Sequence, residues 1–110
     1  MTAETPVLDT LADLAATSVE HNSLAPRELM LARMAALIAV DAPPASYLAN
    51  AGAAADSGVT AEDIQGVMIA VAPVVGTARV VSAGGQIFRA LGLAIAVADS
   101  ETAGNGSAGR

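Results

Sequence analysis

One stretch of the chain, residues 29–40, is apolar at nearly every position and limits the folds open to it. Its sequence is LMLARMAALIAV, in which alanines fill the gaps between larger side chains. A helix that is apolar on all sides must be buried on all sides. A single chain of 110 residues has difficulty surrounding such a helix, so we expect a neighbouring subunit to cover part of it.

Prolines and glycines divide the chain into five expected helices. Pro6 and Pro26 begin the first two, because the first helical position has no use for the N–H group that proline lacks. Asp41-Ala-Pro-Pro ends the second helix, because a residue before a proline avoids the α region. Gly58 ends the third in the left-handed conformation that glycine tolerates. The expected helices span residues 6–19, 26–40, 43–57, 60–72 and 77–97.

The fourth expected helix carries signals at both ends. Thr60 is followed three residues later by Asp63, which is the spacing of a capping box. Pro73 and Gly76 force a kink or a break, because proline cannot donate the next helical hydrogen bond. We therefore expect this helix to end before Pro73.

The composition favours helices over strands. The hydrophobic fraction is 54%, and much of it is alanine, the best helix former. The only aromatic residues are Tyr47 and Phe88, so there is little of the mixture that strands prefer. We expect a single all-α domain over residues 1–98. Residues 99–110, DSETAGNGSAGR, have the polar, Gly- and Ser-containing composition of a disordered tail.

Charge and missing residue types exclude several kinds of function. Five arginines against eleven acidic residues give a formal net charge of −6, which repels phosphate backbones and anionic bilayers. We therefore expect no nucleic-acid partner and no membrane partner. The absence of cysteine excludes thiol chemistry, and the single His21 cannot form a multi-histidine metal site within one chain. No metal and no cofactor are expected. The acidic N-terminal segment shows no sign of a signal peptide, so the expected location is the cytoplasm.

Two segments of the chain, residues 26–50 and 57–80, resemble a known family. They read PRELMLARMAALIAVDAPPASYLAN and SGVTAEDIQGVMIAVAPVVGTARV. Over residues 24–93 the chain resembles the carboxymuconolactone decarboxylase and alkylhydroperoxidase D-like family. This resemblance implies an alkylhydroperoxidase D-like bundle of about five helices that assembles as a homo-oligomer, either a trimer or a hexamer.

The resemblance also indicates where the family's catalytic residues would fall. In the peroxidase branch the two cysteines fall on Pro43 and Ser46, the histidine on Asn50 and a glutamate on Leu31. None of the four is kept. A serine hydroxyl cannot replace a thiolate as the attacking group, so this chain is not a thiol peroxidase. In the decarboxylase branch the pocket glutamate and histidine again fall on Leu31 and Asn50, with Glu28 one turn earlier.

Five residues are candidates for a pocket: Arg33, Glu28, Ser46, Tyr47 and Asn50. Arg33 lies among apolar residues, where it either binds a carboxylate through paired hydrogen bonds or forms a structural ion pair. That ion pair would be with Glu28 or with an acid of a neighbouring subunit. Glu28 is otherwise a surface acid that compensates the helix dipole. Ser46, Tyr47 and Asn50 share part of one helical face and form either a polar pocket wall or a set of caps and intersubunit hydrogen bonds.

Two functions are consistent with these residues. The first is a homo-oligomeric structural or small-ligand-binding protein, favoured by the missing catalytic groups. The alternative is a cofactor-independent decarboxylase or lactone-processing enzyme that acts on a small carboxylate through Arg33, Glu28 and a few hydroxyl groups.

Overall fold

The chain folds into five helices in a computed structural model that describes the backbone of residues 5–109 and the side chains of residues 5–96. The described residues include no strand. The all-α prediction with five helices is therefore confirmed. The helices are α1 Pro6–Glu20, α2 Pro26–Ala39, α3 Pro44–Asp56, α4 Ala61–Val75 and α5 Thr77–Gly109.

Two helices end in the same hydrogen-bonded motif. After α3, Gly58 has a φ of 83°, and the next residue, Val59, donates its N–H to the carbonyl of Ala54. The left-handed Gly58 predicted from the sequence is thus confirmed. After α2, Asp41 has a φ of 56°, and Ala42 donates its N–H back to the Leu37 carbonyl. The helix stop at Asp41 was expected from the prolines, but the left-handed aspartate was not.

The start of α4 is the expected capping box. The Thr60 hydroxyl accepts a hydrogen bond from the Asp63 N–H over 3.1 Å, and the Asp63 carboxylate accepts one from the Thr60 N–H over 2.9 Å. These reciprocal bonds satisfy two N–H groups at the helix start. Arg27 on α2 forms an ion pair with the same carboxylate and so joins α2 to α4.

Two helices extend beyond their predicted ends. α4 passes through Pro73 and ends at Val75, before Gly76 with a φ of 92°. Pro73 leaves the Ile69 carbonyl without its helical N–H partner, but the helix continues for two more residues, so the glycine and not the proline ends it. α5 continues to Gly109 rather than stopping near residue 97. The side chains from residue 97 onwards lie outside the described residues, and the disordered tail over 99–110 stays a prediction.

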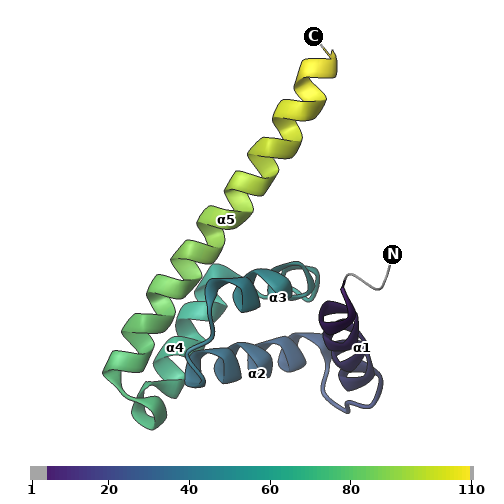
Figure 1. Cartoon of the computed structure of the whole chain (residues 1–110). Helices are drawn as coiled ribbons and strands as arrows, with labels where there is room; N and C mark the ends of the chain where they lie inside the picture. The colour runs from purple at the N-terminus through teal and green to yellow at the C-terminus, as the bar shows by residue number, and fades with distance from the viewer. Residues whose placement is uncertain (1–4, 110) are drawn as a thin grey trace.

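The core is built around one face of α2. Ile38 is fully buried, and its cluster is completed by residues from α2 itself, the α2–α3 turn, α3 and α5: Met34, Ala42, Tyr47, Ala83 and Ala90. Figure 1 shows α2 and α3 lying side by side, with α4 and α5 packed across them. The opposite side of α2 is more open, and Val40 at its end is 68% exposed. Within one protomer α2 is therefore covered along one face only.

The first helix stands apart from this core. No residue of α1 is buried. Its large apolar side chains are all more than half exposed: Val7, Leu8, Leu11, Leu14 and Val19. Figure 1 shows α1 at the far end of α2, while α5 extends well beyond the other helices. No helix in the part searched is long and apolar enough to cross a membrane.

Candidate functional site

A shallow groove brings together two of the five predicted pocket residues. It has a volume of about 340 Å³ and lies between α1, α2 and α3. Its polar side chains include Arg33 from α2 and Asn50 from α3. Its other lining residues are Leu11, Leu14, Ala15, Ser18, Ala36 and Leu37. We call this site the Arg33 groove.

Arg33 is half-buried and is held by a backbone carbonyl. Its guanidinium Nη2 donates a hydrogen bond to the carbonyl oxygen of Ala15 over 3.1 Å. The predicted alternative, an ion pair with Glu28, is not formed, and among the described residues the ion pair is that of Arg27 with Asp63. The hydrogen bond from Arg33 links α1 to α2 and places the guanidinium between the groove and a second hollow, of about 360 Å³, that Asp56 lines.

Asn50 presents its side chain to the groove with one bond already made. Its Nδ2 donates to the backbone carbonyl of Ser46 one turn earlier, over 2.9 Å. Ser46 is half-buried and does not line the groove. It therefore supports Asn50 through its main chain and contributes no hydroxyl to the site.

Tyr47 packs into the core, in the cluster around Ile38. The residue is 4% exposed, and its hydroxyl has no hydrogen-bond partner among the described residues. Burial raises the pKa of the Tyr47 hydroxyl above its ordinary value, and the negative charge of Asp41 raises it further. Ser46, Tyr47 and Asn50 therefore do not form one wall, because Tyr47 packs into the core cluster around Ile38 whereas Asn50 lines the Arg33 groove.

Glu28 acts at the start of α2. Its Oε1 accepts a hydrogen bond from the Ala25 N–H over 3.1 Å, which satisfies an otherwise unpaired group at the helix start. It lines neither the Arg33 groove nor the second hollow. Its position agrees with the interpretation of Glu28 as a helix-terminal acid.

Part of the groove was missed from the sequence. Leu11 and Leu14 form its α1 side, and neither was among the predicted pocket residues. Leu37, on α2, completes the apolar surface opposite them. A cation and an amide beside aliphatic side chains form a site that can bind a small anion with an apolar part.

One family profile matches most of this chain. The profile of the Carboxymuconolactone decarboxylase family matches residues 5–87, which is well over half of the chain. The chain belongs to this family. The match spans α1 to the first part of α5 and so includes every residue of the Arg33 groove. No curated protein and no solved structure matches the chain.

Although the chain belongs to the carboxymuconolactone decarboxylase family, it lacks the residues that thiol chemistry requires. The chain has no cysteine, and the position expected for the peroxidase histidine is Asn50, on the wall of the groove. The position expected for the glutamate is Leu31, which is half-buried on α2. An amide and an aliphatic side chain cannot transfer a proton at neutral pH, so neither of these positions supplies an acid–base group.

Proposed function

We propose that this protein is a homo-oligomer that binds a small carboxylate in the Arg33 groove and carries out no thiol redox reaction. The observation that carries the proposal is that Arg33 and Asn50, far apart in sequence, line one groove with aliphatic walls. The proposal accounts for a half-buried guanidinium that has no carboxylate partner among the described residues.

The guanidinium is suited to the ligand because most of its donors are not used within the chain. Arginine has five N–H donors in a planar fork, and the Arg33 side chain makes one described hydrogen bond, to the Ala15 carbonyl. A carboxylate accepts two parallel N–H bonds from such a fork. The bond to Ala15 limits the rotation of the side chain, so less conformational entropy is lost when a ligand binds.

The aliphatic walls indicate what is attached to the carboxylate. Leu11 and Leu14 face the site from α1, and Leu37 faces it from α2. A ring or a short hydrocarbon chain would contact these side chains while its carboxylate pairs with Arg33. The proposed ligand is therefore a small carboxylate with an apolar body.

Self-association is supported by apolar side chains that one protomer leaves uncovered. On α5, Val81, Phe88 and Ile95 recur every seven residues and are 70%, 75% and 54% exposed. A seven-residue spacing places side chains along one seam of a helix, as in helices that pair with a partner. Together with the exposed stripe of α1, this seam favours assembly from several copies, and the family resemblance implies a trimer or a hexamer.

The alternative, a cofactor-independent enzyme acting on a small carboxylate, has weaker support. It needs a group that transfers a proton next to the bound substrate. Arg33 is the only ionisable side chain that lines the groove within the described residues, and Glu28 is directed to the start of α2. A binding role is therefore the better proposal.

Titration calorimetry with benzoate tests the proposal. We expect the unmodified protein to bind benzoate and Arg33→Met to bind it about 10- to 100-fold more weakly, because a charged hydrogen-bonded pair is lost. Arg89→Met is the matched control, since it removes the same charge from an exposed position on α5. Benzamide keeps the ring without the charge and is expected to bind weakly to every variant. Equal benzoate affinity in Arg33→Met and Arg89→Met would contradict the proposal.

Assembly has a separate test. Sedimentation velocity at micromolar concentration is expected to show a species larger than one chain, whose fraction falls on dilution. A folded monomer over the whole concentration range would show that the exposed side chains of α1 and α5 are not association surfaces.

A further inference from the structure

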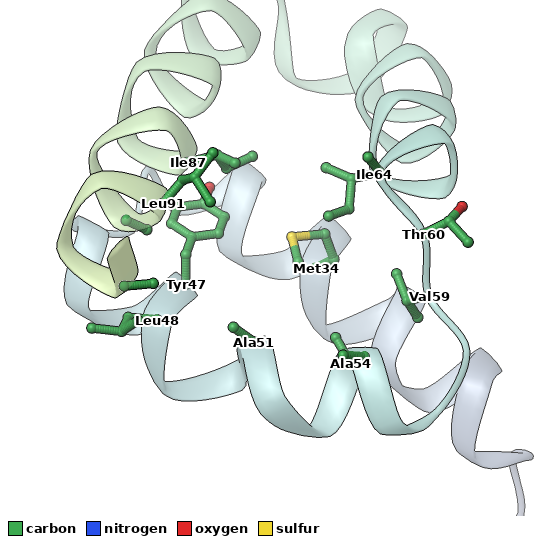
Figure 2. Close-up of a pocket in the computed structure, with 14 residues that line it drawn as sticks. Met34, Tyr47, Leu48, Ala51, Ala54, Val59, Thr60, Ile64, Ile87 and Leu91 are labelled. Carbon is green, nitrogen blue, oxygen red and sulfur yellow. The ribbon is translucent and has the colours of Figure 1, made fainter. Parts of the chain in front are cut away.

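A further cavity lies on the side of α3 that faces α4 and α5. It has a volume of about 240 Å³ and is lined from α2, α3, α4 and α5. Figure 2 shows Met34, Tyr47 and Ile64 around the space, with Ile87 and Leu91 of α5 at one side. Among the residues whose side chains are described, no charged one lines it. We call it the apolar cavity.

Small side chains on facing helices keep this cavity open. α3 contributes Ala51, Ala54 and Ala55 to the lining, and α5 contributes Ala90 and Ala94. Alanine side chains end at the Cβ atom, so two helices that meet through them leave unfilled space unless larger neighbours close it. Here Leu48 and Leu91 lie at the edge and do not fill the space.

We propose that the apolar cavity binds a small uncharged molecule with one or two fused hydrocarbon rings. The size follows from comparison with a cavity of about 150 Å³ lined by aliphatic and aromatic side chains, which stays dry and binds benzene. A volume of about 240 Å³ therefore fits a larger molecule such as naphthalene.

The charge of the ligand follows from the lining. A carboxylate or an ammonium group placed here would lose water and gain at most the exposed Thr60 hydroxyl, which already accepts from the Asp63 N–H. The Tyr47 hydroxyl does not offer a partner, because it is fully covered, and Figure 2 shows it beyond the ring, next to Ile87. Tyr47 presents its ring to the cavity, and an aromatic ligand gains from contact with that ring and with the adaptable Met34 side chain.

This inference does not rest on the proposed carboxylate site. Asn50 and Arg33 line the groove on one side of α3, whereas the lining of the apolar cavity contains neither residue. The two sites select for opposite ligand properties, a negative charge in one and no charge in the other.

Naphthalene is the probe, and equilibrium dialysis measures its affinity for the intact protein. Ala51→Leu fills part of the cavity from an exposed position on α3, which limits the disturbance of the core. Ala49→Leu adds the same side chain at an exposed position outside the cavity and is the matched control. We expect the dissociation constant to rise about tenfold or more in Ala51→Leu and to stay unchanged in Ala49→Leu. Ala55→Leu, exposed and also in the lining, provides a second filling variant.

Two further measurements separate the possible results. Arg33→Met is expected to keep full naphthalene affinity, because Arg33 does not line the apolar cavity. The naphthalene proposal can therefore hold even if the carboxylate proposal fails. 1-Naphthoate is expected not to compete with naphthalene for the apolar cavity. The inference is wrong if the unmodified protein binds no naphthalene, or if both filling variants bind it as well as Ala49→Leu does. The inference is also wrong if naphthalene binds only after Phe88→Ala. That result would mean that Phe88 of a second copy fills the cavity in the unmodified protein.

Discussion

The Ser82 hydroxyl donates a hydrogen bond over 2.6 Å to the carboxylate of Asp41, and this bond joins the end of α2 to α5. Asp41 has a φ of 56°, in the left-handed region that residues with a side chain seldom adopt. Aspartate tolerates this region better than most residues because its short polar side chain bonds locally. One residue therefore ends α2, reverses the chain and anchors it to another helix.

Asp41→Ala is expected to destabilise the protein by about 2–3 kcal/mol, because the left-handed conformation costs roughly 1–2 kcal/mol and the hydrogen bond contributes about 1 kcal/mol. Asp41→Asn is the matched control. Asparagine also tolerates the left-handed region and keeps an oxygen that accepts from Ser82, so its loss is expected to stay below about 1 kcal/mol. Urea unfolding at one fixed protein concentration measures both. Equal losses in the two variants would show that neither the conformation nor the bond matters.

Tyr47 is expected to ionise above its ordinary pKa of 10.0, because burial and the Asp41 charge both oppose the phenolate. It is the only tyrosine and there is no tryptophan, so absorbance at about 295 nm follows this one group. The midpoint is expected near pH 10 in urea and above it in the folded protein. Because the folded pKa is the higher one, the related stability is present below pH 10 and is lost as the pH rises further. Identical midpoints in the two states would contradict the buried position of Tyr47.

Removing the Tyr47 hydroxyl is expected to stabilise the protein. The oxygen is buried without a partner among the described residues, and such a group costs about 1–3 kcal/mol. Tyr47→Phe keeps the ring in the core and is expected to raise the free energy of unfolding by about 1 kcal/mol. Tyr47→Ala removes the ring as well and is expected to lower it by about 3–5 kcal/mol. A destabilised Tyr47→Phe variant would reveal a hydrogen bond to this hydroxyl, for example through water.

The hydrogen bonds to the Asp63 carboxylate lead us to expect a loss of stability in acid. The Thr60 N–H bonded to its carboxylate, with further help from the Thr60 hydroxyl and Arg27, holds the pKa of Asp63 below its ordinary 3.8. Because the folded pKa is the lower one, the stabilisation is present above about pH 4 and is lost as the pH falls through the folded value. Asp63→Asn is expected to flatten the fall in melting temperature below pH 4. Glu62→Gln, one residue earlier in the same turn, removes a carboxylate outside the capping box and is expected to leave that fall unchanged.

Local signals predicted most of the fold, and tertiary contacts explain where they failed. The capping box at Thr60 and the left-handed Gly58 were predicted because each depends on residues within a few positions. The end of α4 was predicted too early, because a helix can continue past a proline at the loss of one hydrogen bond, and here Gly76 ends it. The left-handed Asp41 depends in part on Ser82, about forty residues away, and no local pattern indicates that contact.

The candidate site was predicted only in part, because it too depends on contacts between helices that no local pattern indicates. The sequence placed Tyr47 and Asn50 on one helical face, and residues three positions apart on an α-helix are indeed only about a sixth of a turn apart. Whether these two side chains belong to one site or to two depends on where α5 lies. The core cluster around Ile38 shows that α5 covers Tyr47 and not Asn50. Arg33 was singled out from the sequence as a charge that needs a partner, and its bond to the Ala15 carbonyl became visible only once α1 had been placed.

The exposed stripe of α1 leads to the last prediction. A helix of 15 residues is marginal in water by itself, and α1 has no buried residue in the protomer. If Leu8, which is 65% exposed, stays in water, then Leu8→Gln should change stability by no more than about 0.5 kcal/mol and leave association unchanged. If a second copy covers it, the same substitution removes about 1.5–3 kcal/mol of apolar burial from the interface. We expect the second result, measured by sedimentation as a shift of the larger species toward the single chain. Thr17→Gln introduces the same side chain at an exposed polar position of α1 and should cause no shift.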